Sequence, residues 1–107
     1  MRRLLAFAAL IGAAASAAAP RPAPREQAIA MAGMHFGPAP AGLRAGDTIL
    51  FVNRDIVPHT ATARDHSFDV VVQPHQSGRV TLRHGGAIAF YCRFHPTMQG
   101  VLQVAAR

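Results

Sequence analysis

The amino-acid sequence predicts an all-β fold, an antiparallel sandwich or barrel built from short strands. Two observations lead to this prediction. Apolar residues almost never recur with a helical period beyond the first 17 residues. Instead, short runs of β-branched and aromatic residues follow one another, separated by segments rich in glycine, proline, asparagine and aspartate.

The expected strands lie between residue 28 and residue 106. They are 28–36 (one or two strands), 47–53, 67–72, 78–84, 87–92 and 100–106. The clearest is 78–84, where Val80 and Leu82 share one face and polar residues alternate with them. Residues 54–66 are polar and irregular, and long enough for a functional loop, although a further strand begins at Thr60.

The first 17 residues have the pattern of a secretory signal peptide. Arg2 and Arg3 precede an apolar run, and Ala15-Ser16-Ala17 is a small-residue cleavage pattern. A membrane anchor is the alternative, but the run is short, rich in alanine and lacks a second charged flank. Residues 18–27 are rich in proline and arginine and predict a disordered leader. We therefore expect a signal peptide (1–17), a leader (18–27) and one folded domain (28–107). The signal peptide predicts export of the protein to the periplasm.

Arginine supplies all 11 basic residues, against five acidic ones, for a net charge of +6. Removing the signal peptide with its two arginines leaves nine against five, or +4. The arginines are scattered and form no basic helix or basic–aromatic run, which excludes nucleic acid as a partner. The positive charge favours acidic partner surfaces, and we expect a monomer without stable membrane insertion.

The chain contains one cysteine, Cys92, so it cannot form an internal disulfide. An inert core cysteine is one explanation, but the stretch AFYCRFHPTMQG also places His95 and Met98 at intervals of three residues. A thiolate and an imidazole bind soft or borderline transition metals, and a thioether favours copper over zinc, calcium or magnesium. Pro96 stiffens the turn between these residues. The spacing therefore predicts a copper site on a loop that joins two strands.

Copper of this kind needs a second imidazole, and five other histidines are available. His59 is the best candidate, because it follows the loop NRDIVP, which leaves a strongly apolar strand, and precedes a new strand. The remaining histidines lie in polar or outward positions and are expected on the surface: His35, His66, His75 and His84.

The segments GDTILFVNRDIVPHTAT and FYCRFHPTMQGVLQV resemble the cupredoxins, and the short C-x-x-H-x-x-M loop is most similar to that of amicyanin. The resemblance implies a Greek-key β-sandwich of about eight strands with one type 1 copper ion. It implies His59, Cys92 and His95 as ligands around the metal and Met98 as a weak axial ligand. Thr60 stands where that group usually has asparagine, and Phe94 where it usually has proline.

The resemblance also implies a function as a blue copper electron carrier and not as an enzyme. Protein side chains fill the inner coordination positions of the copper ion and leave none open for a substrate. In this family, electrons leave through the exposed edge of the second histidine. Here that edge belongs to His95, with Thr60, Phe94 and Pro96 around the metal ligands. The expected docking surface comprises Phe94, Pro96, Val57, Pro58, Arg54 and Arg93. Its arginines are expected to steer an acidic redox protein, such as a dehydrogenase, cytochrome or reductase.

Three alternatives stay open at this level. A copper carrier or storage module would need an open site rich in methionine and histidine, for which Met31 and Met34 are few. A mononuclear copper enzyme would need an open coordination position, which loss of the Met98 contact could create. A domain without metal would leave Cys92 inert.

Overall fold

The computed structural model describes residues 4–6, 8–9, 11–12, 20 and 22–107. The predicted cleavage pattern at residues 15–17 lies outside the described residues, as do parts of the signal peptide and the leader, so these stay predictions. Within the described ranges, no helix is long and apolar enough to cross a bilayer.

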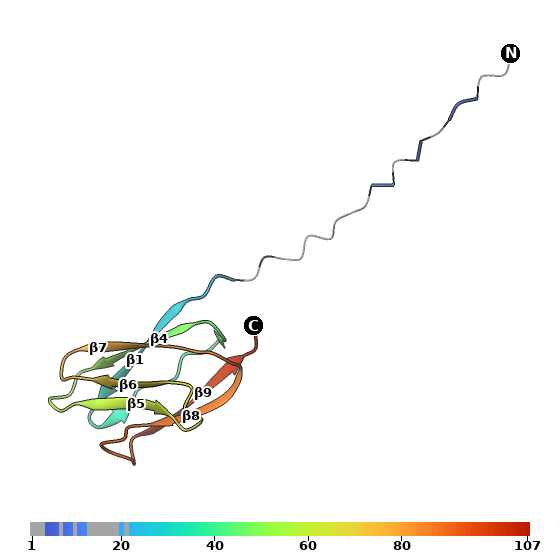
Figure 1. Ribbon diagram of the computed structural model, residues 1–107. Helices are drawn as coiled ribbons and strands as arrows, with labels where there is room; N and C mark the ends of the chain where they lie inside the picture. Colours follow the sequence, from blue (N-terminus) through green and yellow to red (C-terminus); the bar gives the residue numbers. More distant parts are fainter. Residues whose placement is uncertain (1–3, 7, 10, 13–19, 21) are drawn as a thin grey trace.

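Nine strands form in the described residues and pack as two sheets (Figure 1). They are β1 (Glu26–Ala32), β2 (His35–Phe36), β3 (Leu43–Arg44), β4 (Thr48–Asn53), β5 (His59–Ala63), β6 (Asp69–Val72), β7 (Ser77–Thr81), β8 (Gly86–Tyr91) and β9 (Gln99–Ala105). One sheet has the order β2-β1-β4-β7 and the other β3-β9-β8-β5-β6. The predicted all-β sandwich is confirmed.

The sequence predicts antiparallel strands, but two of the strand pairs in the structure are parallel. β1 pairs with β4 in parallel, and so does β3 with β9. Parallel neighbours need a connection that crosses back to the same end of the sheet, which a hairpin cannot provide. Between β1 and β4, the chain passes through β2 and then through β3, which lies in the opposite sheet.

The segment 28–36 forms a hairpin of β1 and β2. Gly33 and Met34 connect the strands with φ values of 58° and 64°, as a two-residue turn of the I′ type requires. β1 begins at Glu26, so the sheet starts two residues before the boundary expected at residue 28. Just before it, the Arg25 amide donates a hydrogen bond to the buried Asp47 carboxylate over 2.9 Å.

The core between the sheets is built by strand alternation and centred on Phe90. The centroid of the Phe90 ring lies 4.7 Å from that of the Phe36 ring and 5.8 Å from that of the Phe51 ring, and both pairs pack edge to face. Gly100 on the neighbouring strand leaves room for this ring, since a Cβ there would lie 2.4 Å from Phe90 Cζ. Ile88 and Phe90 point inward, and Cys92 continues the same alternation just beyond β8.

The polar segment 54–66 divides into a loop and a strand. Its second half forms β5, in which all five residues are buried. β5 begins at His59, and the loop 92–98 joins β8 to β9 at the same end of the sandwich, away from the C-terminus (Figure 1). The fold therefore brings together two segments more than 30 residues apart in the sequence.

Candidate metal centre

Cys92 occupies a fully buried position, with 0 % of its surface exposed. The Thr60 amide, on β5, donates a hydrogen bond to its sulfur over 3.3 Å. The loop that follows Cys92 is closed by backbone hydrogen bonds. The Cys92 amide donates to the Met98 carbonyl over 3.0 Å, and the Met98 amide donates to the His95 carbonyl over 2.8 Å. These bonds hold Met98, which is only 1 % exposed, beside the cysteine at the end of the hairpin.

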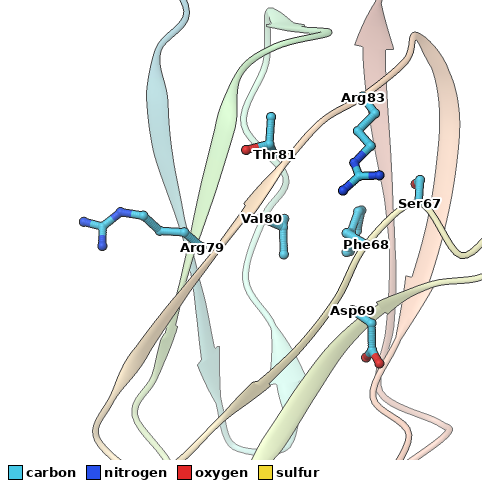
Figure 2. Close-up of a pocket in the computed structure, with 7 residues that line it drawn as sticks. All are labelled: Ser67, Phe68, Asp69, Arg79, Val80, Thr81 and Arg83. Atoms are coloured by element: carbon cyan, nitrogen blue, oxygen red, sulfur yellow. The ribbon is translucent and has the colours of Figure 1, made fainter.

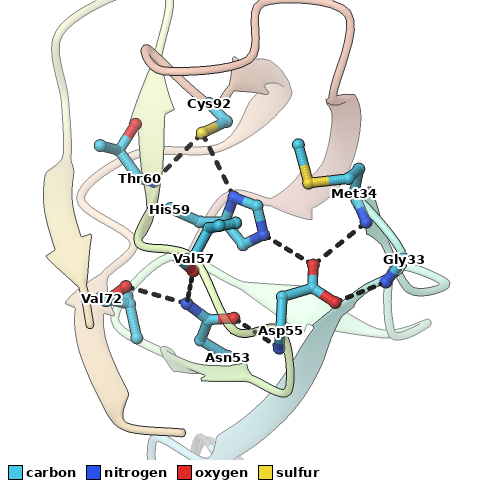
Figure 3. Close-up of polar contacts among 9 residues, drawn as sticks. All are labelled: Gly33, Met34, Asn53, Asp55, Val57, His59, Thr60, Val72 and Cys92. Carbon is cyan, nitrogen blue, oxygen red and sulfur yellow. Dashed lines mark hydrogen bonds and ion pairs between the residues drawn. The ribbon is translucent and has the colours of Figure 1, made fainter. Parts of the chain in front are cut away.

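His59 is also fully buried, and its Nδ1 lies 3.8 Å from Cys92 Sγ (Figure 3). Two ligands of one metal have about this separation. Zinc-like bonds of about 2.1 Å to nitrogen and about 2.3 Å to sulfur, meeting at about 120°, put the two atoms about 3.8 Å apart. The pair therefore fits two corners of a trigonal metal site.

His95 and Met98 complete the predicted ligand set. The His95 ring is half-buried, and its centroid lies 5.3 Å from that of His59 at an interplanar angle of 74°. In the part of the chain that the structure describes, no three His, Cys, Asp or Glu side chains form a ready-made metal group. Two imidazoles, a thiolate and a thioether are donors that fit copper. The four-residue ligand set is consistent with this chemistry and stays a prediction.

Asp55 belongs to the site, although the sequence analysis did not identify it. Its Oδ2 lies 2.7 Å from His59 Nε2, and its carboxylate also accepts hydrogen bonds from the amides of Gly33 and Met34 (Figure 3). The hydrogen bond with His59, followed by that from Met34, holds the pKa of the Asp55 carboxyl below its ordinary value. The sequence offered only a weak signal, an acid four residues before a candidate ligand, because the path of a loop cannot be predicted from spacing.

Asn53 is a second residue that the sequence analysis missed. It is 1 % exposed, and its side-chain amide donates to the carbonyls of Val57 and Val72 over 2.8 and 3.0 Å. Its Oδ1 accepts a hydrogen bond from the Asp55 amide over 2.9 Å. Asn53 therefore closes the loop 54–58 that leads into His59 (Figure 3).

Thr60 ties the two ligand segments together through its side chain. Its Oγ1 accepts a hydrogen bond from the Arg93 amide over 2.8 Å and lies 2.9 Å from Thr62 Oγ1. The Thr62 hydroxyl in turn donates to Asp69 Oδ1 over 2.7 Å. Because Thr62 uses its hydrogen on Asp69, the hydroxyl of Thr60 must donate to Thr62. A directed chain of hydrogen bonds thus runs from the loop 92–98 across β5 to β6.

Nearly the whole chain matches the model of a known protein family. The model of the family described as "Cupredoxin-like domain" matches residues 3–104. The chain belongs to the cupredoxin-like family. No curated protein sequence matches it significantly.

The cupredoxin has an amicyanin-like fold. A Cu(I) form of an amicyanin mutant superposes with a TM-score of 0.63 at 20 % identity, covering 72 % of this chain and 79 % of that chain. Another amicyanin mutant in its reduced state gives a TM-score of 0.62 at 23 % identity, with the same coverage. A third, also reduced, gives 0.63 at 21 % identity and covers 74 % of this chain and 81 % of that one. At these identities, the likeness concerns the fold.

The cupredoxin exposes several apolar residues around the candidate centre. Phe94 is 46 % exposed, Pro58 and Pro96 are exposed, and Val57 is half-buried. Ile56, which the sequence analysis did not include, is 84 % exposed. An apolar surface thus lies on the two loops that carry His59 and His95.

The two arginines expected at this surface are both exposed. Arg93 Nε lies 3.3 Å from Asp69 Oδ1, and its guanidinium lies 5.7 Å from the centroid of the Phe94 ring. The carboxylate of Asp69 therefore offsets part of the charge of Arg93. The other four histidines are exposed, as expected: His35, His66, His75 and His84.

A separate pocket of about 210 Å³ lies between β6 and β7 (Figure 2). Phe68 and Val80 line it together with polar residues, and the Arg79 side chain extends away from the others. The residues that line it include none of the predicted metal ligands.

Proposed function

We propose that this cupredoxin is a type 1 copper protein that carries single electrons between redox partners. The ligands are His59, Cys92 and His95, with Met98 as the weak axial ligand. The observation that carries the proposal is the pair formed by His59 Nδ1 and Cys92 Sγ, both fully buried and 3.8 Å apart. Bound copper would supply the one-electron change between Cu(II) and Cu(I).

The chain's own residues supply rigidity and exclude water. His59, Cys92 and Met98 have 0 %, 0 % and 1 % of their surfaces exposed. Buried donors on paired strands and on a hydrogen-bonded loop cannot move far, which keeps reorganisation during electron transfer small. Burial also leaves no opening for a substrate beside these donors, which supports a carrier over an enzyme. The half-buried His95 is the route by which an electron reaches the surface.

For the partner, we propose a redox protein with an acidic docking surface. The exposed Phe94, Pro58 and Pro96 offer a small apolar contact, which suits brief encounters. Arg54 and Arg93 supply positive charge beside it, so association is expected to slow as salt rises. The predicted signal peptide supports a periplasmic location.

The test is to load the purified protein with Cu(II) and to record optical and paramagnetic resonance spectra. We expect intense blue thiolate-to-copper charge transfer, a narrow copper hyperfine splitting and reversible voltammetry. The Cys92→Ser variant should lose the blue colour, whereas His84→Gln, which alters an exposed histidine outside the ligand set, should keep it. A pale, tetragonal spectrum from the unaltered protein would reject the electron carrier in favour of a copper carrier or enzyme.

A further inference from the structure

We propose that Asp55 is a positioning residue for the metal centre, a role that rests on the proposed function. Its carboxylate orients the His59 ring for metal binding before any metal arrives. Through its negative charge, it also lowers the reduction potential of the bound copper.

The first argument is the orientation of the His59 ring. Nε2 lies 2.7 Å from the Asp55 carboxylate, and Nδ1 faces Cys92 Sγ at 3.8 Å. A neutral imidazole carries one hydrogen, and an ionised carboxylate can only accept. The hydrogen must therefore sit on Nε2, which leaves the lone pair of Nδ1 directed toward the cysteine. A carboxylate that holds the outer nitrogen of a ligand histidine commonly fixes both its tautomer and its ring orientation.

The second argument is that the carboxylate is itself held. The Gly33 amide donates to Oδ1 over 2.7 Å, and the Met34 amide donates to Oδ2, the oxygen that also meets His59, over 3.0 Å. The amide of Asp55 donates to Asn53 Oδ1. The carboxylate cannot turn without losing contacts to both the β1–β2 turn and the histidine. The tight turn at residues 33–34 therefore sets the position of a side chain in the metal centre (Figure 3).

The third argument concerns charge. Asp55 contacts the ligand ring directly, and its side chain is only 16 % exposed, so water screens its charge poorly. A negative charge there stabilises Cu(II) more than Cu(I), because the oxidised site carries one more positive charge. Loss of such a supporting partner typically weakens metal binding 10–100-fold. If Cu(II) binding weakens about tenfold relative to Cu(I) binding, the reduction potential rises by about 59 mV.

Asp65 provides a matched control. Its Oδ2 also lies 2.7 Å from the Nε2 of a histidine, His84, but both side chains are exposed. Asp65 follows the end of β5, whereas His59 begins that strand, so the pair lies at the opposite end of the strand. Asp65→Asn removes the same charge and the same kind of contact without touching the ligand loops.

The experiment is voltammetry of the copper-loaded protein and of three variants. We expect Asp55→Asn to raise the potential by about 59 mV, as a tenfold change in relative affinity gives. Asp65→Asn should leave the potential close to that of the unaltered protein. Asp55→Glu keeps the charge, so its potential should lie nearer the unaltered protein than that of Asp55→Asn. Equal shifts in Asp55→Asn and Asp65→Asn, or equal potentials for Asn and Glu at position 55, would overturn the proposal.

A second measurement uses the metal-free protein, so its outcome does not depend on the copper chemistry. Long-range nitrogen–proton NMR spectra should show His59 protonated at Nε2 and bare at Nδ1, with a slowly exchanging Nε2 proton. In Asp55→Asn, the side chain keeps only one acceptor oxygen, which cannot serve both sites, so either that proton or the Gly33 amide should exchange faster. A proton on Nδ1 of the unaltered protein would overturn the positioning role even if the blue spectrum is found. The expected NMR result without a blue spectrum would reject the proposed function and the effect on the potential, and leave the orientation of His59 supported.

Discussion

Replacing Thr60 with valine tests whether the threonine hydroxyl holds the two ligand segments together. Thr60 is fully buried, and its hydroxyl accepts from the Arg93 amide and donates to Thr62 Oγ1. Valine has nearly the same shape but no hydroxyl. Thr60→Val therefore removes both hydrogen bonds while the Thr60 amide can still reach Cys92 Sγ.

The expected cost follows from the groups left behind. A lost hydrogen bond costs about 1 kcal/mol, and a buried polar group without a partner costs about 1–3 kcal/mol. The Arg93 amide is partly buried and Thr62 is 6 % exposed, so water replaces the lost contacts only in part. We expect the free energy of unfolding to fall by about 2–3 kcal/mol. In a domain of this size, this lowers the melting temperature by about 10–20 °C.

The assay is urea unfolding of the metal-free protein followed by far-ultraviolet circular dichroism, so that metal binding does not mask the change. The slope against urea should stay constant while the midpoint falls. Thr60→Ser is the control, because it keeps the hydroxyl and loses one methyl group, at a cost of about 1 kcal/mol. If valine destabilises no more than serine, the hydroxyl does not hold the loops and the reasoning fails.

The remaining predictions concern the far end of the fold and the core. The carbonyl of the next residue, followed by the Asp65 carboxylate, raises the pKa of His84 above its ordinary value of 6.5. Protonated His84 therefore adds stability below pH 6.5 that is lost as pH rises through the raised pKa. Urea midpoints should decline over that range in the unaltered protein but not in His84→Gln, and parallel profiles would contradict this. Gly100→Ala would place a Cβ 2.4 Å from Phe90 Cζ, so we expect a loss of about 1–3 kcal/mol, measurable by thermal unfolding. An unchanged melting temperature would mean that the ring can move aside.

Much of the fold follows from local patterning. The apolar run 47–53 forms β4 and the alternating run 78–84 forms β7, although β7 ends at Thr81. The same alternation carries Cys92 inward after Ile88 and Phe90. The sequence also predicts the loop that carries Cys92, because its three candidate ligands lie within seven residues.

The sequence by itself determined the class of fold, since strand patterns depend on residue type and short spacing. It also led to two predictions, the donor-rich loop and His59 as the distant imidazole. Only the tertiary structure decided that Asp55 meets His59 and the β1–β2 turn, and that β1 lies parallel to β4. The contact of Asp55 with that turn joins residues 22 positions apart, and although His59 is only four positions from Asp55, their contact depends on the path of the loop between them. A hydrogen bond of that kind depends on how the whole chain packs, and the local pattern of apolar and polar residues cannot predict it.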